Sequence, residues 1–287
     1  MSKPDDDSPP VDTDTDILAG PPSTTYTDFK HARLRQFPGH AGDIKWLEYL
    51  GHGKEGIVFK ASIGSGDPIA IKTRPEPHRL PGGSVIHRDW PFEDESRTVA
   101  LLEKIGWAMS QAESDPGQSV NIKYGPRTGQ DAMRNLKAFS DEERCSSRGP
   151  DDPNLTEPPP FPPFPRCYGW MKIEKNQLPL LDPPVREAED DSSWYWAIIY
   201  ELIPSTGQDI TVGQGFLDFC YAVGFALEFF KPDNWRGGRL VDLNDICSPL
   251  SQGWRIKSVR YREAAKWFWT LDLVQAPKRK ICRVVRT

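Results

Sequence analysis

The chain of 287 residues has no run of about 18 apolar residues, the length that a helix needs to cross a bilayer. Its first ten residues, MSKPDDDSPP, lack the apolar core of a secretory signal. We therefore expect an intracellular protein that neither contacts a membrane nor is exported.

Cysteine is scarce, and the cysteines are scattered. None forms a C-x-x-C pair, and no histidine stands near them at ligand spacing, which excludes a disulfide framework and a zinc site. A reducing compartment fits this usage best. The five residues are Cys145, Cys167, Cys220, Cys247 and Cys282.

Apolar residues are also few, at 37% of the chain, while there are 28 prolines and 23 glycines. This balance predicts a core interrupted by long irregular segments. The aromatic residues, ten of them tryptophan, suffice for one core. We expect residues 1–36 to be a disordered acidic and proline-rich tail and residues 108–163, approximately, to be a flexible insertion.

Charge is unevenly distributed. Residues 255–287 contain ten Lys or Arg against two acids, a balance of +8, so the other 254 residues carry −5 − 8 = −13. A basic tail of this kind can bind nucleic acid or an acidic partner. The alternatives are an ordinary solvated surface or docking onto the acidic part of the same chain.

Strand-forming residues recur in short runs. Residues 44–50, 57–63 and 68–72 predict three consecutive antiparallel strands, and 166–173 and 194–200 predict two more. Residues 91–106 have apolar residues at helical spacing and predict a helix that stops at Gly106. Further helices are expected at 215–225 and around 262–273, with a short strand at 239–243.

A G-x-G-x-x-G pattern lies between the first two strands, at Gly51, Gly53 and Gly56. A Rossmann site would need a helix after the glycines, but Ile57 and Val58 begin a strand. A glycine loop between antiparallel strands is the protein-kinase arrangement, in which the backbone approaches the ATP phosphates. The alternative is an ordinary glycine-rich hairpin.

Two charged residues extend the kinase pattern. Lys72 ends the third strand, where kinases carry the lysine of Val-Ala-Ile-Lys, and Glu95 lies on the apolar side of the following helix. These two side chains are expected to pair and to hold nucleotide phosphates. Taken singly, Lys72 would be an exposed strand lysine and Glu95 a first-turn acid favoured by the helix dipole.

The catalytic region is altered. Lys231 and Asn234 fit the kinase pattern Asp-x-Lys-Pro-x-Asn, and Asp242 stands where the metal-binding Asp of Asp-Phe-Gly belongs. However, Phe229 occupies the position of the catalytic Asp, and a phenyl ring cannot accept a proton. His87, Arg88 and Asp89 spell the kinase triplet before the Glu95 helix, which is the wrong place, so we treat it as chance.

Residues 40–260, outside the insertions, resemble a fungal kinase-like family described as the Sim4 kinetochore complex subunit domain. The resemblance rests on residues 45–72, 92–106 and 200–204, and above all on residues 217–236 and 240–250. It implies a protein-kinase-like fold, protein partners, and a nuclear or kinetochore location.

The expected fold is α+β and kinase-like, with a five-stranded antiparallel N-lobe sheet (37–200) and a shortened helical C-lobe (201–287). A cleft between the lobes would hold ATP and magnesium. Val58 and Ala70 would face the adenine, the backbone from Glu201 to Ile203 its edge, and Asn234 with Asp242 the metal.

Three functions stay open from the sequence. The first is a pseudokinase that binds partners, with or without ATP. The second is an unusual ATP-dependent phosphotransferase in which Asp233 replaces the missing base, beside Lys231. The third is a structural interaction protein with an empty cleft. Nucleotide binding separates the third from the others, and phosphoryl transfer separates the second from the first.

Overall fold

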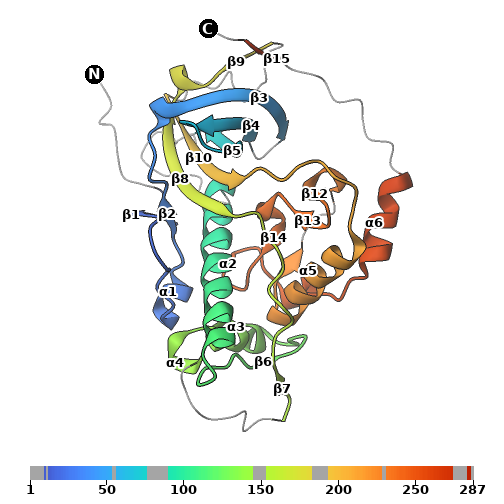
Figure 1. Cartoon of the computed structure of the whole chain (residues 1–287). Helices are drawn as coiled ribbons and strands as arrows, with labels where there is room; N and C mark the ends of the chain where they lie inside the picture. Colours follow the sequence, from blue (N-terminus) through green and yellow to red (C-terminus); the bar gives the residue numbers. More distant parts are fainter. Residues whose placement is uncertain are drawn as a thin grey trace, which may run out of the picture.

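The computed structural model describes residues 10, 12–53, 56–75, 90–144, 153–182, 193–227, 231–273 and 283–285. Within this part the chain is a mixed α+β protein with one large sheet at one end and most of the helices at the other (Figure 1). No helix among the described residues is long and apolar enough to cross a membrane. Cys167, Cys220 and Cys247, the cysteines in this part, are free thiols.

Seven strands form the large sheet in the order β1-β2-β8-β10-β5-β4-β3. The five strands predicted from the sequence occupy adjacent places in it and pair antiparallel, so this part of the prediction is confirmed. They are β3 (Ile44–Gly53), β4 (Gly56–Ile63), β5 (Ile69–Pro75), β8 (Cys167–Glu174) and β10 (Trp194–Glu201).

The two faces of the sheet bury different clusters, because side chains alternate along a strand. On one face, Ile71, Met171 and Ile199 belong to a small apolar cluster. On the other face, Trp196 and Ile198 join the main core, which is shared with the helices. This second face is the one that carries Lys72, directly opposite Ile198 on β10.

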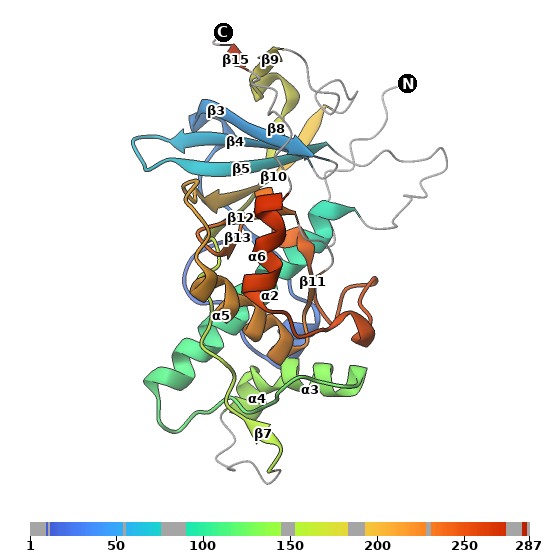
Figure 2. The same ribbon diagram turned by 90° about the vertical axis from the view of Figure 1, so that its right-hand side faces the viewer.

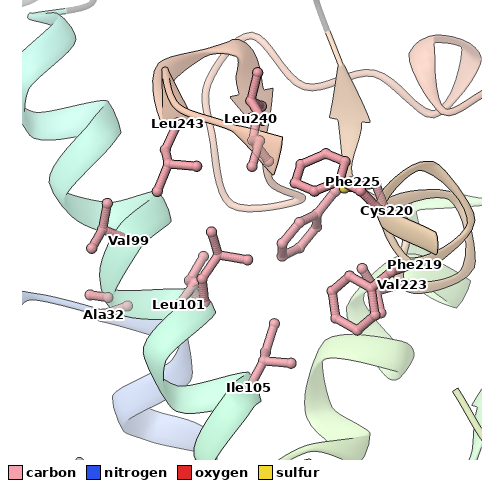
Figure 3. Packing of buried hydrophobic residues seen from close by; sticks show 14 of the residues in the cluster. Ala32, Val99, Leu101, Ile105, Phe219, Cys220, Val223, Phe225, Leu240 and Leu243 are labelled. Atoms are coloured by element: carbon pink, nitrogen blue, oxygen red, sulfur yellow. The ribbon is translucent and has the colours of Figure 1, made fainter. Parts of the chain in front are cut away.

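Helix α2 (Pro91–Ser114) runs from the sheet down through the molecule (Figure 1), and its apolar residues are buried on most sides. Figure 3 shows Val99, Leu101 and Ile105 of α2 facing Leu243 and the aromatic residues at the end of α5 (Ile210–Val223). The expected stop at Gly106 is wrong, because the helix continues for two more turns. A side chain at Gly106 would meet the ring of Phe161, at 2.9 Å, so the glycine serves close packing.

The N-terminal segment differs from the expected disordered tail. From residue 12 onward it forms β1 (Thr13–Ile17), helix α1 (Tyr26–Lys30) and β2 (Leu34–Gln36), and β1 and β2 extend the sheet in parallel. Phe29 and Leu34 are buried in the main core. Residues 1–9 lie outside the described part.

The expected flexible insertion also contains regular structure. It holds β6 (Ile122–Lys123), α3 (Gly129–Ala138), α4 (Asp141–Arg144) and β7 (Leu155–Thr156), of which β6 and β7 pair with each other. Thr128 begins α3 as the N-cap of a capping box with Asp131. Residues 145–152 lie outside the described part.

The C-terminal part consists of short elements around α5, as Figure 2 shows from the side. Helix α5 starts at Ile210, five residues before the predicted 215, because Asp209 caps it through the amides of Thr211 and Val212. Helix α6 (Ala264–Leu273) packs beside α5 (Figures 1 and 2). The remaining elements are short: η1 (Ala41–Asp43), η2 (Lys175–Gln177), β9 (Leu180–Asp182), β11 (Ala226–Leu227), η4 (Pro232–Asn234), β12 (Trp235–Arg236), β13 (Arg239–Leu240), η5 (Leu243–Asp245), β14 (Ile246–Cys247), η6 (Ile256–Ser258) and β15 (Arg283–Val285).

Candidate functional site

The glycine pattern joins β3 to β4 in an antiparallel hairpin, with Gly53 opposite Gly56. Gly56 starts a strand and not a helix, which excludes the Rossmann arrangement at this place. Its φ of 120° and the nearby carbonyl of Thr73, which a Cβ would strike, explain why glycine is required there. Around Gly51 and Gly53 a Cβ would meet nothing within 4 Å, so packing does not explain these two glycines.

Lys72 and Glu95 form the predicted ion pair. The Nζ atom of Lys72 lies 2.8 Å from Oε2 of Glu95, and the Glu95 side chain is fully buried between α2 and the sheet. The same Nζ atom lies 2.6 Å from Oδ1 of Asp242. Lys72 therefore bridges the helix acid and the acid that follows β13, which are 147 positions apart in the sequence.

Two further groups hold Glu95, and sequence reasoning missed them. Arg74 donates from Nη2 to Oε2 of Glu95 at 2.7 Å, and the Tyr200 hydroxyl donates to Oε1 at 2.8 Å. The signal for Arg74 was its place two residues after Lys72, which puts both side chains on one face of β5. Glu95 is thus held by donors from two strands, whether or not Lys72 contacts it.

Arg74 is buried and forms an ion pair with Glu95. It is 3% exposed, and among the described residues its Nε and Nη1 atoms are buried without a hydrogen-bond partner. A buried guanidinium with unmade hydrogen bonds is costly, so its position depends on the charge of Glu95.

The charges around Lys72 fix its protonation state. Burial lowers the pKa of Lys72, but the carboxylates of Asp242 and Glu95 outweigh burial and hold this pKa above its ordinary value. Burial, and next the carboxylate of Glu95, raise the pKa of Tyr200 well above its ordinary value. At neutral pH, Lys72 is therefore a cation and Tyr200 a neutral donor.

A small hairpin brings the side chain of Asn234 to that of Asp242. Strands β12 and β13 pair across a turn at Gly237 and Gly238, both of which have positive φ. At the open end of this hairpin the Asn234 Nδ2 atom lies 3.3 Å from Oδ2 of Asp242. The two predicted metal ligands are therefore neighbours, and Asp242 connects them to Lys72.

Asp245 is a third acid in this cluster that the sequence reading did not single out. It accepts a hydrogen bond from Asn234 Nδ2 at 2.6 Å and is 2% exposed. The Nζ atom of Lys231 lies 3.7 Å from its Oδ1 atom. Asp233, the proposed substitute base, is exposed, whereas its neighbour Asn234 turns toward the acids.

The residues expected around the adenine lie on the same face as Lys72. Val58 pairs directly opposite Lys72, and Ala70 pairs opposite Tyr200. Val58 is half-buried, and Ala70 packs at the edge of the main core.

Glu201 and Ile203 line a cavity of about 520 Å³ at the end of β10. Val58, Ala70 and Lys72 are not among its lining residues. Arg236 donates to the Ile203 carbonyl at 2.9 Å and so joins the β12–β13 hairpin to this segment. The structure thus assembles the phosphate and metal candidates in one cluster and the base-edge candidates in a separate cavity.

Several predictions fall outside the described residues. Phe229, which the sequence pattern places at the position of the catalytic base, is one, and so is the triplet of His87, Arg88 and Asp89. Lys54 and Glu55 of the glycine hairpin also lie outside. The reading of Phe229 stays a prediction from the sequence.

The donor set suits magnesium better than zinc. Asp242 and Asp245 carry hard carboxylate oxygens, and Asn234, whose Nδ2 atom donates to both acids, has an amide oxygen as a further hard donor. Mg²⁺ is usually bound by one or two carboxylates together with substrate phosphates. Among the described residues there is no group of three or more His, Cys, Asp or Glu arranged to hold a metal by itself. Asp242, Asp245 and Asn234 have the kind of oxygen donors that a Mg²⁺ ion would need from the protein.

Comparison with known proteins gives no family. No model of a known protein family matches the chain, and a search of curated proteins finds no significant match.

Proposed function

We propose that this chain is a kinase-like module that binds ATP with magnesium and acts through partners as a pseudokinase. The convergence of Lys72, Glu95 and Asp242 at ion-pair distances carries the proposal, because these residues come from β5, α2 and the segment after β13. An ion pair between a strand lysine and a helix acid, next to a metal-binding acid, is how kinases hold nucleotide phosphates.

The positions of the cations support this function. Lys72 would contact phosphate oxygens while Arg74 and Tyr200 keep the charge of Glu95 satisfied. Asp242, Asp245 and Asn234 would hold the magnesium ion, which neutralises phosphate charge. The open space around Gly51 and Gly53 would let the backbone of the hairpin approach the phosphates.

The resemblance to the Sim4 kinetochore complex subunit family extends the proposal to a place of action. A kinase-like module without its catalytic base would serve that setting by binding other proteins. Nuclear or kinetochore association is accordingly part of what we propose, and co-purification from nuclear extracts would test it.

Thermal unfolding with and without Mg-ATP tests nucleotide binding. Ligand at 100 times its Kd should stabilise the protein by about 2.7 kcal/mol. Lys72→Met should abolish most of this shift, and Asp242→Asn should remove mainly the part that depends on magnesium. Lys45→Met is the matched control, because Lys45 is an exposed lysine on β3 of the same sheet. If saturating Mg-ATP leaves the melting temperature unchanged, the cleft is empty and the structural alternative replaces this proposal.

Labelled ATP tests the absence of catalysis. General-base contributions of about 10²–10⁴-fold make the loss of the acid at position 229 severe. We expect no transfer to the protein itself or to generic acceptors. Transfer that is present in the native chain and lost in Asp233→Asn would instead establish an enzyme.

A further inference from the structure

Three tyrosines form a row on the surface of the helical part. They come from the segment after β6 (Tyr124), from α5 (Tyr221) and from the segment before α6 (Tyr261). Their ring centroids are 5.6 and 5.7 Å apart, each pair edge to face. Tyr124 and Tyr261, at the two ends of the row, are 47% and 54% exposed.

Tyr261 belongs to a basic segment. Residues 255–262 contain four cations and no acid. Arg255, Lys257 and Arg260 are exposed, and the hydrogen bonds of Arg255 and Arg260 go to backbone carbonyls of the same segment. Within the described part of the chain, none of these three cations is paired with a carboxylate. Docking onto the acidic part of the chain, one alternative from the sequence, does not account for them.

The basic segment is fastened to α5. Trp254 donates from its ring nitrogen to the Gly224 carbonyl at 2.9 Å. At the other end, Gln214 of α5 accepts from the amide of Ala264 at 2.8 Å and donates to the Arg262 carbonyl. Arg262 itself lies over the ring of Trp267, at 4.1 Å from its centroid. The exposed cations are therefore presented from a fixed backbone, which lowers the entropy lost when a ligand binds.

We propose that Tyr261 together with Arg255, Lys257 and Arg260, here called the basic–aromatic surface, binds single-stranded nucleic acid. An exposed ring offers a face on which an unpaired base can stack, and the three cations would neutralise phosphates. An acidic peptide would use the charges but gain little from the ring, and a duplex hides its base faces. The four residues lie within seven consecutive positions, so at most about 20 Å of chain separates them and a short oligonucleotide can reach all of them.

The far end of the tyrosine row, at Tyr124, limits where the bound oligonucleotide can lie. Asp218 stands on α5 one turn before Tyr221, the middle ring of the row, and burial and next this carboxylate raise the pKa of Tyr124. Phosphates are disfavoured near Asp218 and favoured near Arg260. The proposed site thus extends from Tyr261 along the basic segment and away from Tyr124.

Fluorescence anisotropy of the full chain with a labelled oligo(dT) strand tests the proposal, with an unstructured RNA and a DNA duplex of equal length beside it. Both single strands should bind more tightly than the duplex. Three phosphate contacts predict a slope of about −2 for log K against log salt concentration. Replacing Arg255, Lys257 and Arg260 together by Ala should bring the slope close to zero.

Tyr261 separates stacking from simple charge attraction. Tyr261→Ala should weaken binding by about 5- to 150-fold with the salt slope unchanged, and Tyr261→Phe should keep most of the affinity. Replacing Lys30, Arg33 and Lys45 by Ala removes the same charge elsewhere on the surface and should have little effect. Lys72→Met should leave the oligonucleotide affinity unchanged, so this surface is tested independently of the nucleotide site.

Three outcomes would overturn the proposal. One is that neither the native chain nor the variants bind the oligonucleotide at 50 mM salt, although all of them unfold at the same temperature. Another is that Tyr261→Ala and Tyr261→Phe bind the oligonucleotide with equal affinity, because binding would then be due to nonspecific charge attraction and not to stacking. The third is displacement of the oligonucleotide by polyglutamate at equal charge concentration, which points to an acidic protein as the partner.

Discussion

Glu95 is the residue on which the buried charges near the sheet depend. It forms ion pairs with both Lys72 and Arg74 and accepts a hydrogen bond from the Tyr200 hydroxyl. Since all three partners lie in the interior, none can turn to water for a substitute. The arrangement keeps α2 attached to β5 and β10 even when Lys72 moves toward another anion.

Replacing this carboxylate should therefore be costly. Glu95→Gln leaves two buried cations with Asp242 as the remaining acid, and we expect a loss of about 3–5 kcal/mol in the free energy of unfolding. Urea denaturation measures it. Glu113→Gln is the matched control, because it makes the same change at an exposed position of α2. Equal stability of the two variants would show that Glu95 does not hold the charges together.

Substitutions of Gly56 and Gly53 in the β3–β4 hairpin should also differ in their effect on stability. Gly56→Ala places a Cβ against the Thr73 carbonyl at a positive φ and should destabilise the protein by more than about 1 kcal/mol. Gly53→Ala meets no atom within 4 Å and should leave stability nearly unchanged. If Gly53→Ala also reduces the stabilisation by Mg-ATP, the open glycines serve the nucleotide and not the fold. Equal stability losses in the two variants would contradict this division.

At the scale of elements, helix α3 depends on its capping box. The Asp131 carboxylate accepts from the amides of Arg127 and Thr128, at 3.1 Å each, and from Lys123 Nζ at 2.9 Å. The hydrogen bond from Lys123 is the largest cause that lowers the pKa of Asp131 to about 2 from 3.8. Because the folded pKa is depressed, this contribution is present above pH 3.8 and is lost as the pH falls toward 2.

Asp131→Asn should remove that dependence on pH. The native chain should lose more stability between pH 4 and pH 2 than the variant does, as measured by urea denaturation at each pH. Thr128→Ala deletes the other half of the capping box and should cost about 1 kcal/mol at pH 6. If the native chain and the Asp131→Asn variant lose stability in parallel below pH 4, the ionised Asp131 carboxylate does not stabilise the fold as we propose.

On the scale of the whole molecule, the N-terminal segment is part of the core. Phe29 is fully buried in the cluster that also contains Leu101 and Ile105 of α2. Asp12 pairs with Arg97 of the same helix, and Arg35 pairs with Glu103. The segment thus covers one side of α2 along much of its length, as Figure 1 shows.

Phe29→Ala should consequently destabilise the whole domain. Removing a buried phenyl ring costs about 3–5 kcal/mol, which we expect to see in urea denaturation. Ile17→Ala is the control in the same segment, because Ile17 is 56% exposed and should change stability by no more than about 0.5 kcal/mol. If the N-terminal segment were disordered, neither substitution would change the free energy of unfolding.

The five adjacent strands and the order of the charged residues could be predicted from local sequence patterns. Strand formation follows from local composition and period, and so does the hairpin between Gly53 and Gly56. The pairing of Lys72 with Glu95 also followed from the sequence, through the kinase pattern. These features depend on short stretches of chain or on a known order of motifs.

The tertiary structure alone decided the rest. Residues 12–36 look disordered by composition, yet they are ordered because α2 and the sheet offer a surface for Phe29 and Leu34. Gly106 looks like a helix stop, yet α2 continues because Phe161 packs against the bare glycine. Arg74 is held by Glu95, 21 positions further along the chain. In each case the stabilising contact is made by residues distant in sequence, and local composition carries no information about such contacts.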